Sequence, residues 1–126
     1  MTFAFSGRSK FNADIAHWDV SHVVAFDNMF DAAVTFNQKI SGWVTSSALS
    51  MNAMFRKSES FNHDISVWNT TLVTDMRNMF NGALQFNHDI YKWSGAAAST
   101  PQEDMLLGAT AFNVKYLCAV ENNAQS

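Results

Sequence analysis

The sequence predicts an α/β repeat solenoid, which is a right-handed coil with a narrow parallel sheet on one face and short helices on the other. Three observations lead to this fold class: a phrase that recurs at a fixed interval, apolar residues that mark a short bent strand within it, and a helix-like apolar spacing after it. In such a fold each repeat packs only against its neighbours, so the repeats together build one continuous core.

The repeated phrase is easiest to follow from its tryptophans, which lie 25 residues apart at Trp18, Trp43, Trp68 and Trp93. The phrase reads FNADIAHW from residue 11, FNQKISGW from 36, FNHDISVW from 61 and FNHDIYKW from 86. A fifth start, FN at 112, follows the fourth after 26 residues. We therefore expect a single domain over 1–126, made of a partial repeat 1–10, repeats 11–35, 36–60, 61–85 and 86–111, and a degenerate cap 112–126.

The first half of each repeat is expected to form a short strand at a bend. In the third repeat, the spacing of Phe61, Ile65 and Trp68 matches neither strict alternation nor the 3.6-residue helical period. When the repeats stack, the phenylalanines, the isoleucines and the tryptophans should each form a buried column, with Tyr116 ending the isoleucine column. Parallel strands about 4.8 Å apart would then form hydrogen bonds from coil to coil.

The second half of each repeat is expected to be a short helix. Apolar residues recur there at helical spacing, as in Val73, Met76, Met79, Phe80 and Ala83. Candidate N-caps precede them at Ser21, Ser46 and Thr71. In the fourth repeat, Thr100-Pro101-Gln102-Glu103 fits a capping box with proline at the first helical position, and Gly108 can end that helix. The extra residue of this repeat should lie in a turn over 94–99.

Composition narrows the classes of partner. Charged residues make up 15% of the chain, and 8 basic against 11 acidic side chains give a net charge of -3. This balance argues against nucleic-acid binding and against a basic membrane-surface patch. No apolar run reaches the ~18 residues of a membrane span. The single cysteine, Cys118, excludes an intrachain disulfide. The first residues do not read as a signal peptide, and because they begin inside a repeat we expect Met1 to head a fragment.

The repeat also resembles a known family. Its phrase, Phe-Asn-x-Asp-Ile-x-x-Trp followed by Val-Thr-x-Met-x-x-Met-Phe-x-Gly-Ala, is best preserved over 61–83. It resembles a bacterial surface-protein repeat grouped with the BspA-like leucine-rich-repeat surface proteins. The resemblance implies a leucine-rich-repeat-like coil, a cell-surface or secreted location, and an adhesive or binding role. It brings no catalytic residue, and the chain carries no export signal or anchor that would settle its location.

Polar residues at the start of the phrase form the candidate site. The residues that we expect in an exposed ladder or facing a partner are Asp14, Lys39, His63, Asp64, His88 and Asp89. Histidines one coil apart, with carboxylates beside them, have the donor atoms of a transition-metal site. The same columns, however, also carry Ala13, Gln38 and Lys39, which favours a solvated ladder. We therefore expect no metal, no cofactor and no catalytic residue.

These observations favour a non-catalytic binding or display module, acting in protein–protein interaction or adhesion. The alternative is a structural spacer or self-assembling solenoid, because both ends of a coil stack expose unpaired strands. A third candidate is a glycan-binding module in which tryptophans stack on sugars. A protein is the expected partner, with a glycan second, and self-association would use the ends. An enzyme is not expected.

Overall fold

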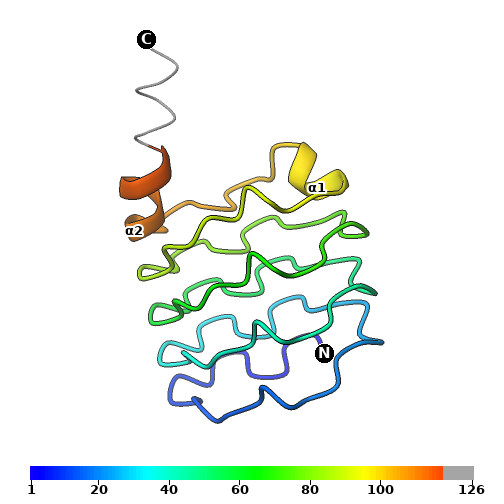
Figure 1. Cartoon of the computed structure of the whole chain (residues 1–126). Coiled ribbons are helices and arrows are strands. Elements are labelled where there is room, and N and C mark those ends of the chain that lie inside the picture. Colours follow the sequence, from blue (N-terminus) through cyan, green and yellow to red (C-terminus); the bar gives the residue numbers. More distant parts are fainter. Residues whose placement is uncertain (118–126) are drawn as a thin grey trace.

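Residues 1–117 of the chain, which a computed structural model describes, form a stack of similar coils (Figure 1). The N-terminal coil lies at one end of the stack and the residues from 86 onward at the other. Backbone hydrogen bonds join each coil to the next, as in Asn28 N–H to Asn52 O at 2.9 Å and Phe55 N–H to Met79 O at 2.9 Å. The period of the sequence is therefore the length of one coil.

The predicted fold class is wrong in its secondary structure. Residues 1–117 contain no sheet, and parallel pairing is limited to isolated bridges that join Ala25 to Ser50 and Ser50 to Asp75. The phrase segments at 11–15, 36–40, 61–65 and 86–90 lie outside the turns, but they are joined through asparagine side chains, since the amides of Asn37, Asn62 and Asn87 donate to the preceding asparagine Oδ1. Neither the narrow parallel sheet nor a row of helices facing it exists in residues 1–117.

The segments expected to be helices are runs of turns at 27–32, 52–57 and 77–82. Alternate amides bond within the coil, as in Met29 N–H to Phe26 O at 3.1 Å. The amides between them bond to the next coil, as in Phe30 N–H to Met54 O at 2.9 Å. Positive φ angles at Asn28 (56°) and Ala32 (60°) exclude an α-helix. Turns that bond three residues back reproduce the apolar spacing of a helix, which explains the wrong prediction.

All regular helices of residues 1–117 lie in the last coil: α1 (Ala96–Ser99), α2 (Thr110–Phe112) and the π-helix η1 (Asn113–Leu117). The predicted turn at 94–99 is thus mostly α1, and the predicted capping box is absent because Thr100 is the extended residue that follows α1. Gly108, with φ 75°, belongs to the turn run 103–108. The predicted N-cap Ser21 lies in a β-turn, where its hydroxyl donates to Asp19.

The core consists of aromatic columns, as the period predicts. Ring centroids along the phenylalanine column are 5.7, 5.9, 6.1 and 6.2 Å apart, from Phe11 through Phe36, Phe61 and Phe86 to Phe112. A second column, Phe5, Phe30, Phe55 and Phe80, packs beside it at centroid distances of 3.8 to 4.2 Å. The predicted burial of tryptophan is confirmed for Trp43, Trp68 and Trp93, which are 4 to 7% exposed. It is wrong for Trp18, which is half-buried at the open N-terminal end.

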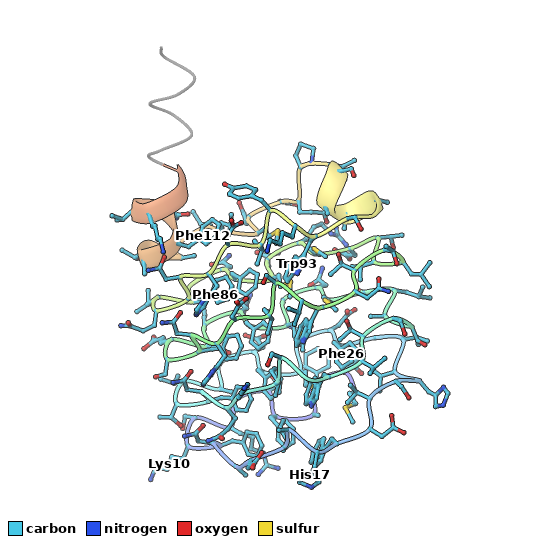
Figure 2. All side chains as sticks on the ribbon, viewed as in Figure 1. Lys10, His17, Phe26, Phe86, Trp93 and Phe112 are labelled. Atoms are coloured by element: carbon cyan, nitrogen blue, oxygen red, sulfur yellow. The ribbon has the colours of Figure 1, made fainter. Side chains whose placement is uncertain are left out.

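Phe112 is the last residue to keep the register of the stack. Its ring lies above Phe86 at the C-terminal end and is fully buried (Figure 2). Asn113 then leaves the register, because its amide bonds to Ala109 O at 2.9 Å within the helical segment. Of the predicted cap 112–126, residues 118–126 lie outside the described part of the chain, and so does the side chain of Tyr116.

Candidate functional site

Each complete coil carries a β-turn between its isoleucine and its tryptophan. In all four turns, the tryptophan amide donates to the isoleucine carbonyl at 3.1 Å. The two central residues of each turn are the dipeptides at 16–17, 41–42, 66–67 and 91–92. We call this column of four dipeptides the turn ridge.

Buried residues on both sides hold the turn ridge in place. The isoleucines that begin the turns are at most 8% exposed. Each interior tryptophan also donates its indole N–H to the isoleucine carbonyl of the preceding coil, at 3.1 Å for Trp43, 3.0 Å for Trp68 and 3.1 Å for Trp93. A buried indole N–H needs such an acceptor. The same bond therefore fixes the depth and the orientation of every turn.

The residues at the tips of these turns are exposed, apart from the half-buried Ser41 and Ser66, and differ from coil to coil. They read Ala-His, Ser-Gly, Ser-Val and Tyr-Lys from the first turn to the fourth. Val67 is 71% exposed and Tyr91 60% exposed. His17, at the N-terminal end of the ridge, points away from the body of the stack (Figure 2). One backbone geometry thus presents four different pairs of side chains.

The predicted carboxylates lie at the foot of the turn ridge. The Oδ1 atoms of Asp14, Asp64 and Asp89 each accept the amide N–H two residues on, at 3.0, 2.9 and 2.8 Å. Such Asx turns stabilise the first tip residue. The amide of Ser66, followed by its hydroxyl, lowers the pKa of Asp64 below its ordinary value. Lys39 occupies the same position in the second coil, is exposed, and has no oxygen with which to accept this bond.

The predicted histidines lie one residue earlier and bond to backbone. His63 Nε2 lies 3.1 Å from Asn37 O, and His88 Nε2 lies 3.0 Å from Asn62 O. Gln38, the residue at this position in the second coil, donates its Nε2 to Asn12 O at 2.9 Å. Within residues 1–117 no group of three or more His, Cys, Asp or Glu side chains is arranged to hold a metal ion.

The six predicted residues lie at two neighbouring positions of the phrase, just before the turn ridge; the aspartates and Lys39 are exposed, and the two histidines are half-buried. The tip residues His17, Val67, Tyr91 and Lys92 were not singled out from the sequence. The sequence could have indicated them, because they vary from phrase to phrase while the isoleucine and the tryptophan on either side stay the same. The expected sugar platform is not available on the interior tryptophans, because those rings are buried.

Comparison with known proteins places the chain in a family. A family model described as "Mycoplasma protein of unknown function, DUF285" matches residues 1–118. The chain belongs to this family. The match takes in all four phrases and the whole turn ridge, so the DUF285 unit includes the candidate site. No curated protein and no solved structure matches the chain at a significant level. None of the helices in residues 1–117 is long and apolar enough to cross a membrane.

Proposed function

We propose that the chain is a non-catalytic binding and display module whose turn ridge contacts a protein partner. The observation that carries this proposal is the contrast within each turn, where a buried isoleucine and a tryptophan that do not vary flank two residues that change from coil to coil and include the exposed His17, Val67 and Tyr91. A scaffold that holds variable side chains on rigid elements limits the entropy lost on binding.

The predicted polar residues support a scaffold role for the foot of the ridge. Asp14, Asp64 and Asp89 hold the turns, and His63 and His88 bond to the coil that precedes them. These side chains are therefore already engaged in the fold. Variation among the tips then changes the surface offered to a partner without changing the bonds beneath it.

The resemblance to BspA-like surface proteins fits the same proposal. Under it, the module is part of an exported protein, and the turn ridge faces the outside of the cell. The partner would be recognised through mixed contacts, with the aromatic and cationic pair Tyr91-Lys92 at one end of the ridge and His17 at the other. Exposed aromatic residues commonly anchor protein interfaces.

A peptide library displayed on phage and selected on the immobilised chain would test the proposal. The selected peptides should bind the wild type and lose at least tenfold in affinity for a ridge variant carrying His17→Ser, Val67→Ser and Lys92→Ser. The control variant carries His22→Ser and Leu72→Ser, which alter exposed turn residues outside the ridge. Equal binding of the selected peptides to the ridge variant and to the wild type would refute the proposal. It would also be refuted if no peptide were selected and the chain bound a glycan on an array.

A further inference from the structure

Every junction between coils uses the same three bonds along the repeated phrase. The backbone N–H of an asparagine donates to the asparagine Oδ1 of the preceding coil, at 2.8, 3.0 and 2.9 Å for Asn37, Asn62 and Asn87. The next side chain, glutamine or histidine, bonds to the preceding asparagine carbonyl. The indole of the tryptophan completes the set by donating to the preceding isoleucine carbonyl. In these three bonds of the phrase, the acceptor lies on the earlier coil and the donor on the later one.

At the C-terminal end of the stack, the three acceptors of the fourth phrase do not meet, within residues 1–117, the donors that the other phrases meet. Asn87 Oδ1 is buried and has no hydrogen-bond partner. Within residues 1–117, no side chain donates to Asn87 O, and Ile90 O accepts only the amide of Trp93. The cause is the departure of Asn113, whose amide bonds to Ala109 instead of reaching Asn87. A buried acceptor without a donor is unfavourable, so a ligand that supplies donors gains free energy here.

An apolar cleft lies beside these acceptors. It has a volume of about 170 Å³ and is lined by Ile90, Trp93 and Leu106, by Ala97 of α1 and by Phe112 of α2. Trp93 lies near this end of the stack, between α1 and the Phe112 side chain (Figure 2). The cleft is where an interior coil would carry the isoleucine and tryptophan of the next phrase. Phe112 already fills the place of the next phenylalanine.

We propose that this end binds an extended peptide of the form Asn-His-x-Ile-x-x-Trp, which is the repeated phrase without its phenylalanine. The three junctions inside the chain show which donors bind at equivalent acceptors. By analogy, Asn87 Oδ1 accepts from a main-chain N–H, Asn87 O from a histidine or glutamine nitrogen, and Ile90 O from an indole N–H. The apolar side chains of the peptide enter the cleft. This mode extends the stack by one partial coil and leaves the turn ridge free.

A whole second copy fits this surface less well than a peptide does. Its N-terminal coil offers the matching donors, the amide of Asn12 and the indole of the half-buried Trp18. In register, however, its Phe11 would need the place that Phe112 occupies above Phe86. A peptide that begins at the asparagine has no such conflict.

The probe is a synthetic peptide with the sequence of residues 62–69, NHDISVWN, with a free amino terminus and an amidated carboxyl terminus, titrated into the full chain by calorimetry. We expect micromolar binding, weakened at least tenfold by Asn87→Ala and to a similar degree by replacing the peptide's tryptophan with alanine. Asn87→Ala should leave the urea midpoint unchanged or raise it, because the change removes a buried Oδ1 atom that has no hydrogen-bond partner. The matched control is Asn12→Ala at the opposite end, which removes an acceptor used by Asn37 and Gln38. It should lower the urea midpoint and keep peptide affinity within twofold.

Three results would overturn the proposal: no binding at millimolar peptide, equal binding by Asn87→Ala, or loss of binding in the ridge variant with its three serines. Sedimentation provides a further check. A dimer of the wild type that disappears in Asn87→Ala, without peptide binding, would assign this end to a second copy and overturn the peptide proposal. The ridge variant keeps the two proposals separate, because it should lose ridge partners and still bind the peptide.

Discussion

The interior coils over 36–85 and the last coil over 86–117 differ in one respect, which is whether a complete further coil follows. In the interior, alternate amides of each turn run donate to the next coil, and no helix forms. In the last coil, α1, α2 and η1 all appear. Backbone amides need partners. The turn run at 103–108 keeps the same conformation although no further coil follows it within residues 1–117, so the local sequence is enough to form these turns. The helices α2 and η1 appear only beyond this run, where the amide of Asn113 bonds within the helical segment to Ala109 O and not to the fourth phrase.

The largest expected effect compares an interior tryptophan with the terminal one. Trp68→Ala removes a ring that is 4% exposed, stacked against Trp43 and bonded to Ile40 O. We expect a loss of ~3–5 kcal/mol in the free energy of unfolding, as for other buried aromatic truncations. Trp18→Ala should cost clearly less in this chain, because Trp18 is only half-buried. Urea melts measure both, and equal losses would contradict the view that a coil is held by its two neighbours.

The next effect concerns Gly95, the N-cap residue that directly precedes α1. Gly95 has φ 103°, and an added Cβ would lie 2.6 Å from the Thr71 carbonyl oxygen. Gly95→Ala should therefore destabilise the chain by ~1–3 kcal/mol through backbone strain and steric overlap. Gly42→Ala is the matched control, since a Cβ at Gly42 meets nothing within 4 Å. Thermal melts should show a clear drop for Gly95→Ala only, and similar melting temperatures would show that α1 can move without loss.

A smaller effect depends on pH. The Arg77 side chain donates to Asp75 at 2.9 Å, and this bond lowers the pKa of Asp75 to about 2. The unfolded chain takes up this proton near the ordinary value of 3.8, so it binds more protons than the folded chain between these values. The stabilisation is thus complete above pH 3.8 and is lost as the pH falls toward 2. Urea midpoints over this range should fall less steeply for Asp75→Asn and for Arg77→Gln, and an unchanged slope would contradict this origin.

The smallest effect is expected on the turn ridge. Val67→Ser changes a side chain that is 71% exposed and makes no bond that the turn requires. Its effect on stability should stay within ~0.5 kcal/mol, as for other surface positions. The comparison is Ile65→Ser, at the buried start of the same turn. A Val67→Ser melt as low as that of Ile65→Ser would show that the tip is part of the packed structure.

The period of the sequence was enough to predict the coil length and the buried columns. Phe36, Phe61 and Phe86 stack as expected because identical residues at one interval must meet when coils repeat. The same pattern does not distinguish a helix from a run of turns, because apolar residues three and four positions apart fit both structures. The deciding φ angles include one at Ala53, an alanine that gives no local sign of a left-handed conformation.

The role of the aspartates and histidines as a candidate site stays a prediction. Their place next to the turns follows from the phrase that they share with buried residues. Their bonds were not predictable, because Asn37 O and Asn62 O come from neighbouring coils and are distant along the chain. The tips of the turn ridge were not predicted, because the candidate residues came from the positions that repeat. In a repeated scaffold, the exposed residues that differ between equivalent positions are candidates for binding as well.

The linking of each coil only to its neighbours has a mechanical consequence. Amides, indoles and ring nitrogens all link one coil to the next, so a force that separates the two ends of the chain acts first on the junction of a terminal coil. Coils should then detach one at a time. Each releases 25 residues between successive tryptophans, which extend to roughly 80–90 Å. A chain built this way would lengthen in equal steps under force, and the coils that have not yet detached would stay folded.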